Sequence, residues 1–234
     1  MELRHILLGV GFALIWASAF PSAKMAVQFC PPFLFLFIRF LSAGLFSIML
    51  GAYLGQSLNF DRKSLLWITT FGLIQNGLYL GLIFLALTKI DANVSVIIAS
   101  ILPLTVAFFS WVFFKAKISF LGLFGLVVGL AGVLLIMLQR VEKEIELLGI
   151  TLCLLGLLAT TFSTLIITKI KINKNNILIV VGLQMLAGSL FLLPLSYFFE
   201  IWSVSFNVTF LFTFIYIAAF PGIIGPVIWF YLQK

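Results

Sequence analysis

Three apolar stretches follow one another between Asn76 and Met137 with almost nothing between them. Residues 89–92 and 115–117 are the only interruptions, and each is too short to hold a separate domain. Each stretch is about 20 residues long, the length that an α-helix needs to cross the hydrocarbon core of a bilayer. The three stretches are therefore expected to fold back on one another as antiparallel helices packed inside a membrane.

The composition of the whole chain excludes a soluble domain. Hydrophobic residues form 63% of the 234 residues and charged residues only 9%, whereas a soluble domain carries roughly a quarter charged residues. A fold of this size cannot bury so much apolar surface away from water. In lipid, only helices and closed β-barrels satisfy their own backbone polar groups. The runs lack the alternation of barrel strands, so the predicted fold class is all-α, a polytopic helical membrane protein.

Polar, charged or proline-containing breaks divide the chain into eight predicted spans. The breaks at residues 30–32, 55–61, 140–144 and 173–176 contain prolines, turn-forming residues or clustered charges, none of which suits the middle of a membrane helix. The predicted spans are residues 6–27, 33–54, 65–87, 92–114, 118–138, 148–168, 177–199 and 209–232.

The distribution of basic residues predicts that the N-terminus lies in the cytoplasm. In this orientation nine lysine and arginine residues fall on the inner side and four on the outer side, with five of the seven acidic residues outside. Such an excess of positive charge is typical of cytoplasmic loops. We therefore expect a multi-pass protein of the cytoplasmic membrane. The net charge of +7 is scattered along the chain, so no nucleic-acid partner is expected.

The chain aligns with itself at a constant offset of 145 residues. The pairs that carry this alignment are Gly11 with Gly156, Ser18 with Ser163, Lys24 with Lys169, Gly77 with Gly222, and Lys89 with Lys234. Five predicted spans precede the offset point. Because five is odd, the second copy is expected to enter the membrane in the opposite orientation, as in the inverted repeats that surround the solute site of many secondary transporters.

The offset predicts two structural units. Residues 1–144 form a first repeat of five helices, and residues 145–234 form an incomplete second repeat of three helices. A complete second copy would end at residue 289, which is 55 residues beyond Lys234. We therefore expect that eight helices of a ten-helix plan are present.

Several short motifs occur in a fixed order along the first unit. They are GFALIWASAF at residues 11–20 followed by Lys24, IRF at residues 38–40 followed by Ala43, LPL at residues 102–104, and the glycines from Gly122 to Gly132. In this order and spacing they resemble the EamA family of ten-helix permeases, within the drug/metabolite transporter superfamily. One position departs from the family, because Ala116 stands where a glutamate is usual.

The resemblance implies an integral membrane transporter that moves a small organic metabolite, often outward, through a cavity between the repeats. The leading hypothesis is accordingly an exporter. The alternative is a truncated, non-transporting membrane fragment or scaffold. The expected partners are a small-molecule substrate and the lipid bilayer, and a homo-oligomer is left open.

Polar, aromatic and proline residues inside the spans are the candidates for the wall of such a cavity. Arg39 lies six residues inside its predicted span, where a charge is costly and is a functional hypothesis by default, although a long side chain can also reach the headgroups. Gln75 and Tyr79 share a helix face with four-residue spacing, and with neighbouring Asn76 they either line a solute path or bond between helices. The full set of candidates is Trp16, Arg39, Gln75, Asn76, Tyr79, Pro103, Thr161, Gln184 and Pro226.

The remaining candidates also have structural interpretations. Pro103 and Pro226 remove helix hydrogen bonds and are expected to kink their spans, and kinks mark the site in some transporters. Trp16 lies near the middle of its span, where it either packs or walls the cavity. Thr161 belongs to a hydroxyl cluster whose members are expected to bond to carbonyls of their own helix.

No arrangement of residues in the sequence suggests catalysis or metal binding. His5 is the only histidine, and Cys30 and Cys153 lie far apart in the sequence. The spans contain no pair of carboxylates, and the sequence contains no glycine-rich loop of the kind that binds phosphate. We therefore expect no enzyme activity, no cofactor and no bound metal, and two unpaired thiols.

Overall fold

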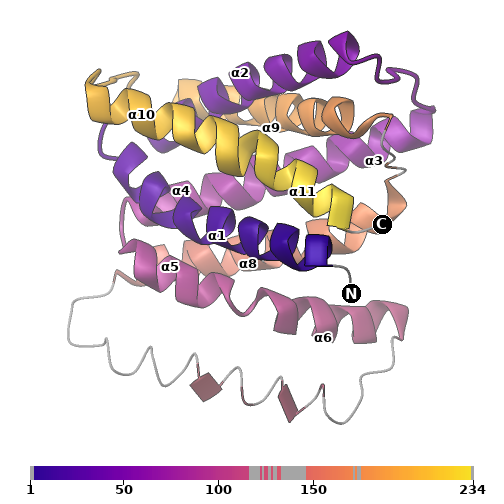
Figure 1. Ribbon diagram of the computed structural model, residues 1–234. Coiled ribbons are helices and arrows are strands. Elements are labelled where there is room, and N and C mark those ends of the chain that lie inside the picture. The colour runs from indigo at the N-terminus through magenta and orange to yellow at the C-terminus, as the bar shows by residue number, and fades with distance from the viewer. Residues whose placement is uncertain are drawn as a thin grey trace.

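The computed structural model describes residues 3–115, 122, 124–125, 128, 131–132, 146–170, 172 and 175–232. Within these residues the chain forms helices and no strands, and the long helices lie side by side across the bundle (Figure 1). The predicted all-α fold class is confirmed.

Seven helical segments of the described residues are long and apolar enough to cross a membrane. Their ends lie within three residues of seven of the predicted spans, and the predicted span 118–138 falls mainly on residues outside the described set. The chain is therefore a multi-pass membrane protein. The segments are Leu3–Ala26, Pro32–Tyr53, Arg62–Leu87, Ala92–Phe114, Leu147–Ile166, Ile177–Phe199 and Val208–Leu232.

Some spans are single helices and others are divided. The undivided ones are α1 (Leu3–Ala26), α2 (Pro32–Tyr53), α8 (Leu147–Ile166), which continues into a short 3₁₀ turn η2 (Ile167–Lys169), and α9 (Ile177–Phe199). The divided ones are α3 (Arg62–Gly72), η1 (Leu73–Tyr79) and α4 (Leu80–Leu87); α5 (Ala92–Ala99) and α6 (Leu102–Phe114); and α10 (Val208–Ile217), η3 (Ala218–Ile224) and α11 (Gly225–Leu232).

Two causes divide these spans. The α-helix stops at Ser100 and Ile101, just before Pro103, because proline lacks an N–H and its ring clashes with the carbonyl four residues earlier. This is the break predicted from the sequence. The segments η1 and η3 are π-helices, in which the backbone bonds reach one residue further than in an α-helix.

The helix boundaries repeat along the chain at the offset found in the sequence. Adding 145 to the bounds of η1 and α4 gives the bounds of η3 and α11. The same shift carries α2 onto 177–198, one residue short of the end of α9. The same series of local structures therefore occurs twice, in one register.

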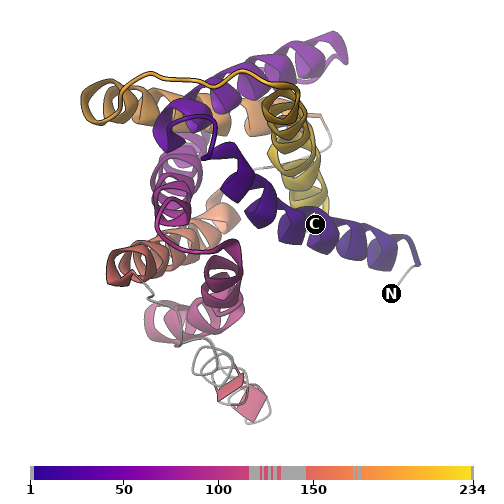
Figure 2. The ribbon, with the colours of Figure 1, turned by 90° about the vertical axis from the view of Figure 1, so that its left-hand side faces the viewer.

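The most extensive contact between described helices is that of α2 with α9, the two helices that correspond at this offset. Gly44 on α2 faces Gly182 and Leu186 on α9, while the Ser189 hydroxyl on α9 donates to the Phe37 carbonyl of α2 over 3.3 Å. Later residues of one helix thus meet earlier residues of the other, so the pair is antiparallel. Helix α9 also packs against α3 and η1. Figure 2, viewed along the bundle, shows this pair at one edge and α5 with α6 towards the other.

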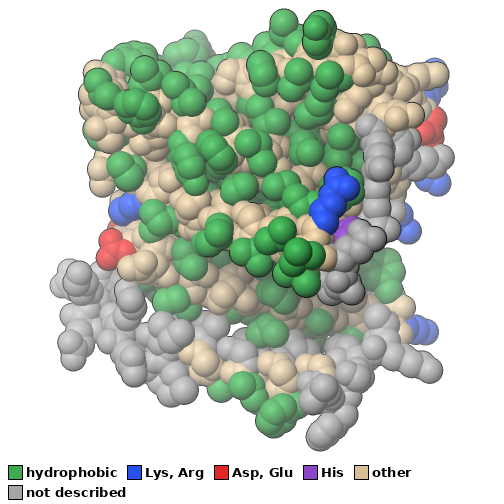
Figure 3. Space-filling view, in the orientation of Figure 1, with side chains coloured by type: hydrophobic (Ala, Val, Ile, Leu, Met, Phe, Trp, Pro, Cys, Tyr) green, Lys and Arg blue, Asp and Glu red, His purple; other side chains and the backbone are tan. Residues whose placement is uncertain are grey.

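Both ends of the described chain lie on one side of the bundle (Figure 1). The guanidinium carbon of Arg4 lies 5.4 Å from the ring centroid of Tyr231, so the start of α1 is next to the end of α11. Lysine and arginine side chains gather mainly at the same end, on the right of Figure 3.

We expect Cys30 and Cys153 to resist thiol reagents in the folded protein. Both are free thiols, 3% and 0% exposed. Burial raises the pKa of the Cys30 thiol, in the turn between α1 and α2, from 9.0 to about 12, and the Glu200 carboxylate adds to this rise. The thiol therefore stays neutral between pH 7 and 9, whereas the thiolate is the reactive form. Mass spectrometry after maleimide treatment at neutral pH should find no label on native protein and two labels after denaturation. Rapid labelling of native protein would contradict this.

Candidate functional site

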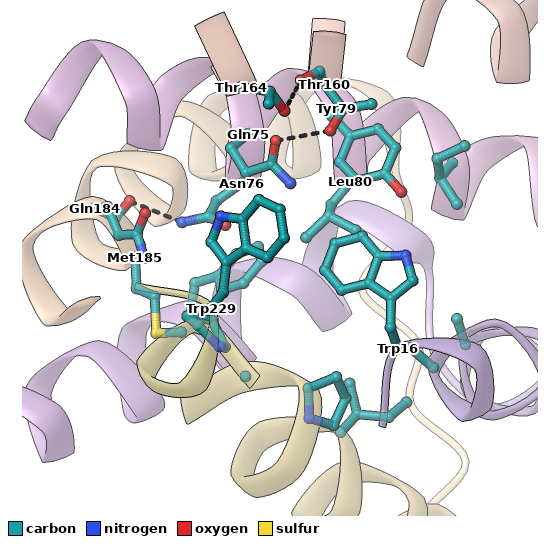
Figure 4. A pocket seen from close by; sticks show the side chains of 18 of the residues that line it. Trp16, Gln75, Asn76, Tyr79, Leu80, Thr160, Thr164, Gln184, Met185 and Trp229 are labelled. Atoms are coloured by element: carbon teal, nitrogen blue, oxygen red, sulfur yellow. Dashed lines mark hydrogen bonds between the residues drawn. The ribbon is translucent and has the colours of Figure 1, made fainter. Parts of the chain in front are cut away.

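A cavity of about 300 Å³ lies inside the bundle, and each of the seven described spans contributes to its wall. This volume is at the lower end of the range for small-molecule pockets. Figure 4 shows part of the wall, with the indole of Trp229 near the middle of the view and that of Trp16 to its right. The wall is mainly apolar, and its described aromatic residues are Phe12, Trp16, Phe20, Phe40, Phe71, Tyr79, Phe84, Trp229 and Phe230.

Eight of the nine candidate residues line this one cavity. They come from six separate helical elements, so only the folded bundle brings them together. That a solute binds among them stays a prediction. They are Trp16 on α1, Arg39 on α2, Gln75, Asn76 and Tyr79 on η1, Pro103 on α6, Gln184 on α9 and Pro226 on α11.

Thr161 is the candidate that the structure places elsewhere. It is fully buried, its hydroxyl donates to the Leu157 carbonyl over 2.7 Å, and it lies 2.7 Å from the Thr105 hydroxyl of α6. Thr160 and Thr164 line the cavity in its place. One residue turns an α-helix by about 100°, so an error of one position moved the prediction to the wrong face. The predicted bonding to the helix backbone is confirmed for Thr161.

Several wall residues were missed, and the internal offset is the signal that points to them. In five pairs of residues separated by 145 positions, both members line the cavity, so the offset brings further residues to the same wall. The pairs are Ala19 with Thr164, Arg39 with Gln184, Phe40 with Met185, Asn76 with Pro221, and Phe84 with Trp229.

Hydrogen bonds hold the polar part of the wall in place. Gln75 accepts hydrogen bonds at Oε1 from the hydroxyls of Ser163 and Thr160, the latter over 3.0 Å. Asn76 donates from Nδ2 to the backbone carbonyl of Gln184 over 3.1 Å (Figure 4). These residues join η1 to α8 and α9, so the predicted bonding between helices is confirmed for Gln75 and Asn76. Both also line the cavity, and a role in a solute path stays a prediction.

Arg39 is the cation on the described cavity wall. Its side chain is 4% exposed, so it turns into the bundle and does not extend to the headgroups. The guanidinium carbon lies 4.8 Å from the ring centroid of Phe40, and Nε has no hydrogen-bond partner among the described residues. The same is true of Oε1 of Gln184. Two buried polar atoms on residues 145 positions apart thus have no hydrogen-bond partner in the described part of the chain.

The described wall has the chemistry of a binding site. It contains no acidic side chain, histidine or cysteine, and the described residues form no cluster of three or more metal-ligating side chains. What it offers is aromatic surface, amide and hydroxyl groups, and one guanidinium. Such a wall can select a molecule by shape, polarity and charge.

Comparison with known proteins gives one family and several relatives. Residues 3–138 match the EamA-like transporter family. "Uncharacterized transporter in trpA 3'region" of Buchnera aphidicola subsp. Schlechtendalia chinensis is 29% identical, over 98% of this chain and 76% of its own length. "Uncharacterized transporter YvbV" of Bacillus subtilis (strain 168) is 25% identical, over 98% and 75%. "Uncharacterized transporter" of Buchnera aphidicola subsp. Schizaphis graminum (strain Sg) is 27% identical, over 95% and 75%. No solved structure matches the chain significantly.

Proposed function

Because this chain belongs to the EamA-like transporter family, we propose that it exports a small organic solute across the cytoplasmic membrane through the cavity described above. The observation that carries the proposal is the origin of the cavity wall, in which five pairs of residues at the 145-residue offset face the same space. A site shared by equivalent positions of two units is the arrangement from which secondary transporters alternate access.

The proposed mechanism treats residues 1–144 and 145–234 as two repeats of opposite orientation. The antiparallel contact of α2 with α9 and the matched bounds of η1 and η3 support this arrangement. Rocking of one repeat against the other would open the cavity first to one side of the membrane and then to the other.

We propose that the N-terminus lies in the cytoplasm. The gathering of lysine and arginine side chains on the side of both chain ends supports this orientation (Figure 3), since positive charge is retained on the cytoplasmic side.

The orientation can be tested with variants that each carry one new cysteine. Ser57 follows α2 and Ser203 follows α9, so these exposed residues lie at opposite ends of the bundle. An impermeant maleimide should label Ser203→Cys on intact cells, and Ser57→Cys only after the cells are opened. The unchanged chain is the control, because its own cysteines are buried. The reverse pattern of labelling would refute the orientation.

Transport can be tested with two variants in which an alanine of α1 is replaced by tryptophan. Ala19 lines the cavity, whereas Ala17 is exposed on the outside of the bundle. Ala19→Trp should fill much of the cavity and abolish transport, while Ala17→Trp should leave it unchanged. Cells producing each protein are compared for the small molecules that accumulate in the medium. An exporter raises at least one of them with the unchanged chain and with Ala17→Trp. If Ala19→Trp raised the same molecules in the medium as much as the unchanged chain does, the proposal would be refuted.

A further inference from the structure

Arg39 brings a positive charge into the cavity that no described wall residue neutralises. Its Nε lacks a hydrogen-bond partner within the described residues, no ion pair between described residues involves it, and no described acidic side chain lines the cavity. An uncompensated charge is costly in a bundle surrounded by lipid. The aromatic face of Phe40 offsets only part of this cost.

The fold itself does not explain the charge. The equivalent position of the second unit is Gln184, which also faces the cavity and packs on the same α2–α9 pair. A neutral amide is therefore accommodated at a matching place in the bundle. The guanidinium is thus better explained by a ligand than by packing.

The remaining wall favours a flat, apolar body. The ring of Phe12 lies 5.2 Å from that of Trp229 and 5.6 Å from that of Trp16, measured between centroids, so three aromatic side chains of the wall adjoin one another. Aromatic side chains bind flat apolar groups through large contact areas and favourable ring geometry. This part of the wall presents few polar groups that would favour a polar ligand over an apolar one.

Building on the proposed function, we propose that the solute is a small aromatic monocarboxylate whose carboxylate is bound by Arg39. One guanidinium matches one negative charge, and its fork of donors matches the two oxygens of a carboxylate. An amino group on the solute would find no described carboxylate to pair with. Gln184 supplies a second contact, since its amide can either accept or donate a hydrogen bond according to its orientation.

The test uses four probes that differ in charge or in the ring: phenylacetate, phenylacetamide, phenethylamine and acetate. Binding is measured by equilibrium dialysis with the protein in phosphatidylcholine nanodiscs, which carry no net lipid charge. Phenylacetate should bind about ten- to a hundred-fold more tightly than phenylacetamide, the difference expected for hydrogen bonds to a charged group. Phenethylamine and acetate should bind more weakly than phenylacetate.

Two variants test whether Arg39 causes the preference for phenylacetate. Arg39→Gln installs the residue found at the equivalent position of the second unit, and should remove the preference for phenylacetate over phenylacetamide. Arg62→Gln, at the exposed start of α3, is the control and should retain it. The comparison of probes on the unchanged chain needs no variant, so the test holds even if Arg39→Gln folds poorly.

The outcomes separate this inference from the proposed function. Equal binding of the carboxylate and the amide, or retention of the preference in Arg39→Gln, would overturn the role of Arg39. If Ala19→Trp still blocked transport in that case, the cavity would remain the solute route. Transport that persists in Ala19→Trp would instead refute the proposed function.

Discussion

Replacing Gly72 with valine is expected to lower the free energy of unfolding by about 3 kcal/mol, at the upper end of the usual cost of overpacking. Gly72 ends α3 where it crosses α9, and a Cβ there would overlap the backbone carbonyl group of Gln184. Since the opposing group is main chain and not a flexible side chain, no rotamer change relieves the clash. The two helices would have to separate.

The matched control is Gly9→Val on α1. A Cβ at Gly9 meets no described atom within 4 Å, so the change introduces valine into a helix without a clash. Thermal unfolding of the purified variants in one detergent compares the two directly. Similar melting temperatures for both would show that the crossing of α3 and α9 is looser than the structure describes.

The second large effect is expected at Glu200, a surface carboxylate that caps a distant helix. Pro31 precedes helix α2 as its N-cap and Pro32 is its first residue, and neither carries an N–H or a capping side chain. The next two N–H groups, of Phe33 and Leu34, donate to the two carboxylate oxygens of Glu200 over 2.7 and 2.8 Å. The carboxylate thus satisfies free donors of the first turn and also meets the positive end of the helix dipole.

Replacing Glu200 with alanine should destabilise the protein by about 2 kcal/mol, since two charge-assisted bonds at a helix start are lost. Glu146→Ala is the control. Glu146 is half-exposed and lies 3.2 Å from Lys89, and such a surface ion pair contributes less than about 1 kcal/mol. Equal losses of thermal stability in the two variants would contradict the capping role.

Glu200→Gln separates charge from shape at the same position. One of the causes that raise the pKa of the Cys30 thiol is the Glu200 charge, so its removal should lower that pKa. Because burial remains, the pKa should stay above its ordinary value. Maleimide labelling of Cys30 at alkaline pH should therefore be faster in Glu200→Gln than in the unchanged chain, and an unchanged rate would argue against this coupling.

The sequence predicted the spans well because lipid leaves few alternatives. A segment without water must close its own hydrogen bonds as a helix, and prolines and polar runs then mark the ends. The π-helical turns were not predicted. Residues 73–79 carry no proline or charge that distinguishes them from their surroundings. Their geometry arises with contacts made only in the folded bundle, such as the approach of Asn76 to Gly188 and Gln184.

The cavity wall was predictable for a related reason. Polar and proline residues inside spans are costly in lipid, so those that occur tend to face protein or a cavity. This picks out Arg39, Gln75 and Gln184. The face of an all-apolar helix is harder to assign, since lipid and protein contacts favour the same side chains. Thr161 was misplaced because four hydroxyl residues lie within positions 160–164, and adjacent positions of a helix face different directions. A purely aromatic wall residue such as Phe84 gives no signal without the offset.

The two π-helical turns also affect how the spans tolerate changes in length. Each turn holds one residue beyond what an α-helical turn would contain, so losing one residue from η1 or η3 would let it tighten into α-helix. The helices on either side would keep the faces that they present to their neighbours. A loss of one residue within an undivided span such as α2 would instead rotate everything beyond it by about 100°. Among the described residues, η1 and η3 are thus places at the cavity wall where a span can shorten while its remaining contacts survive.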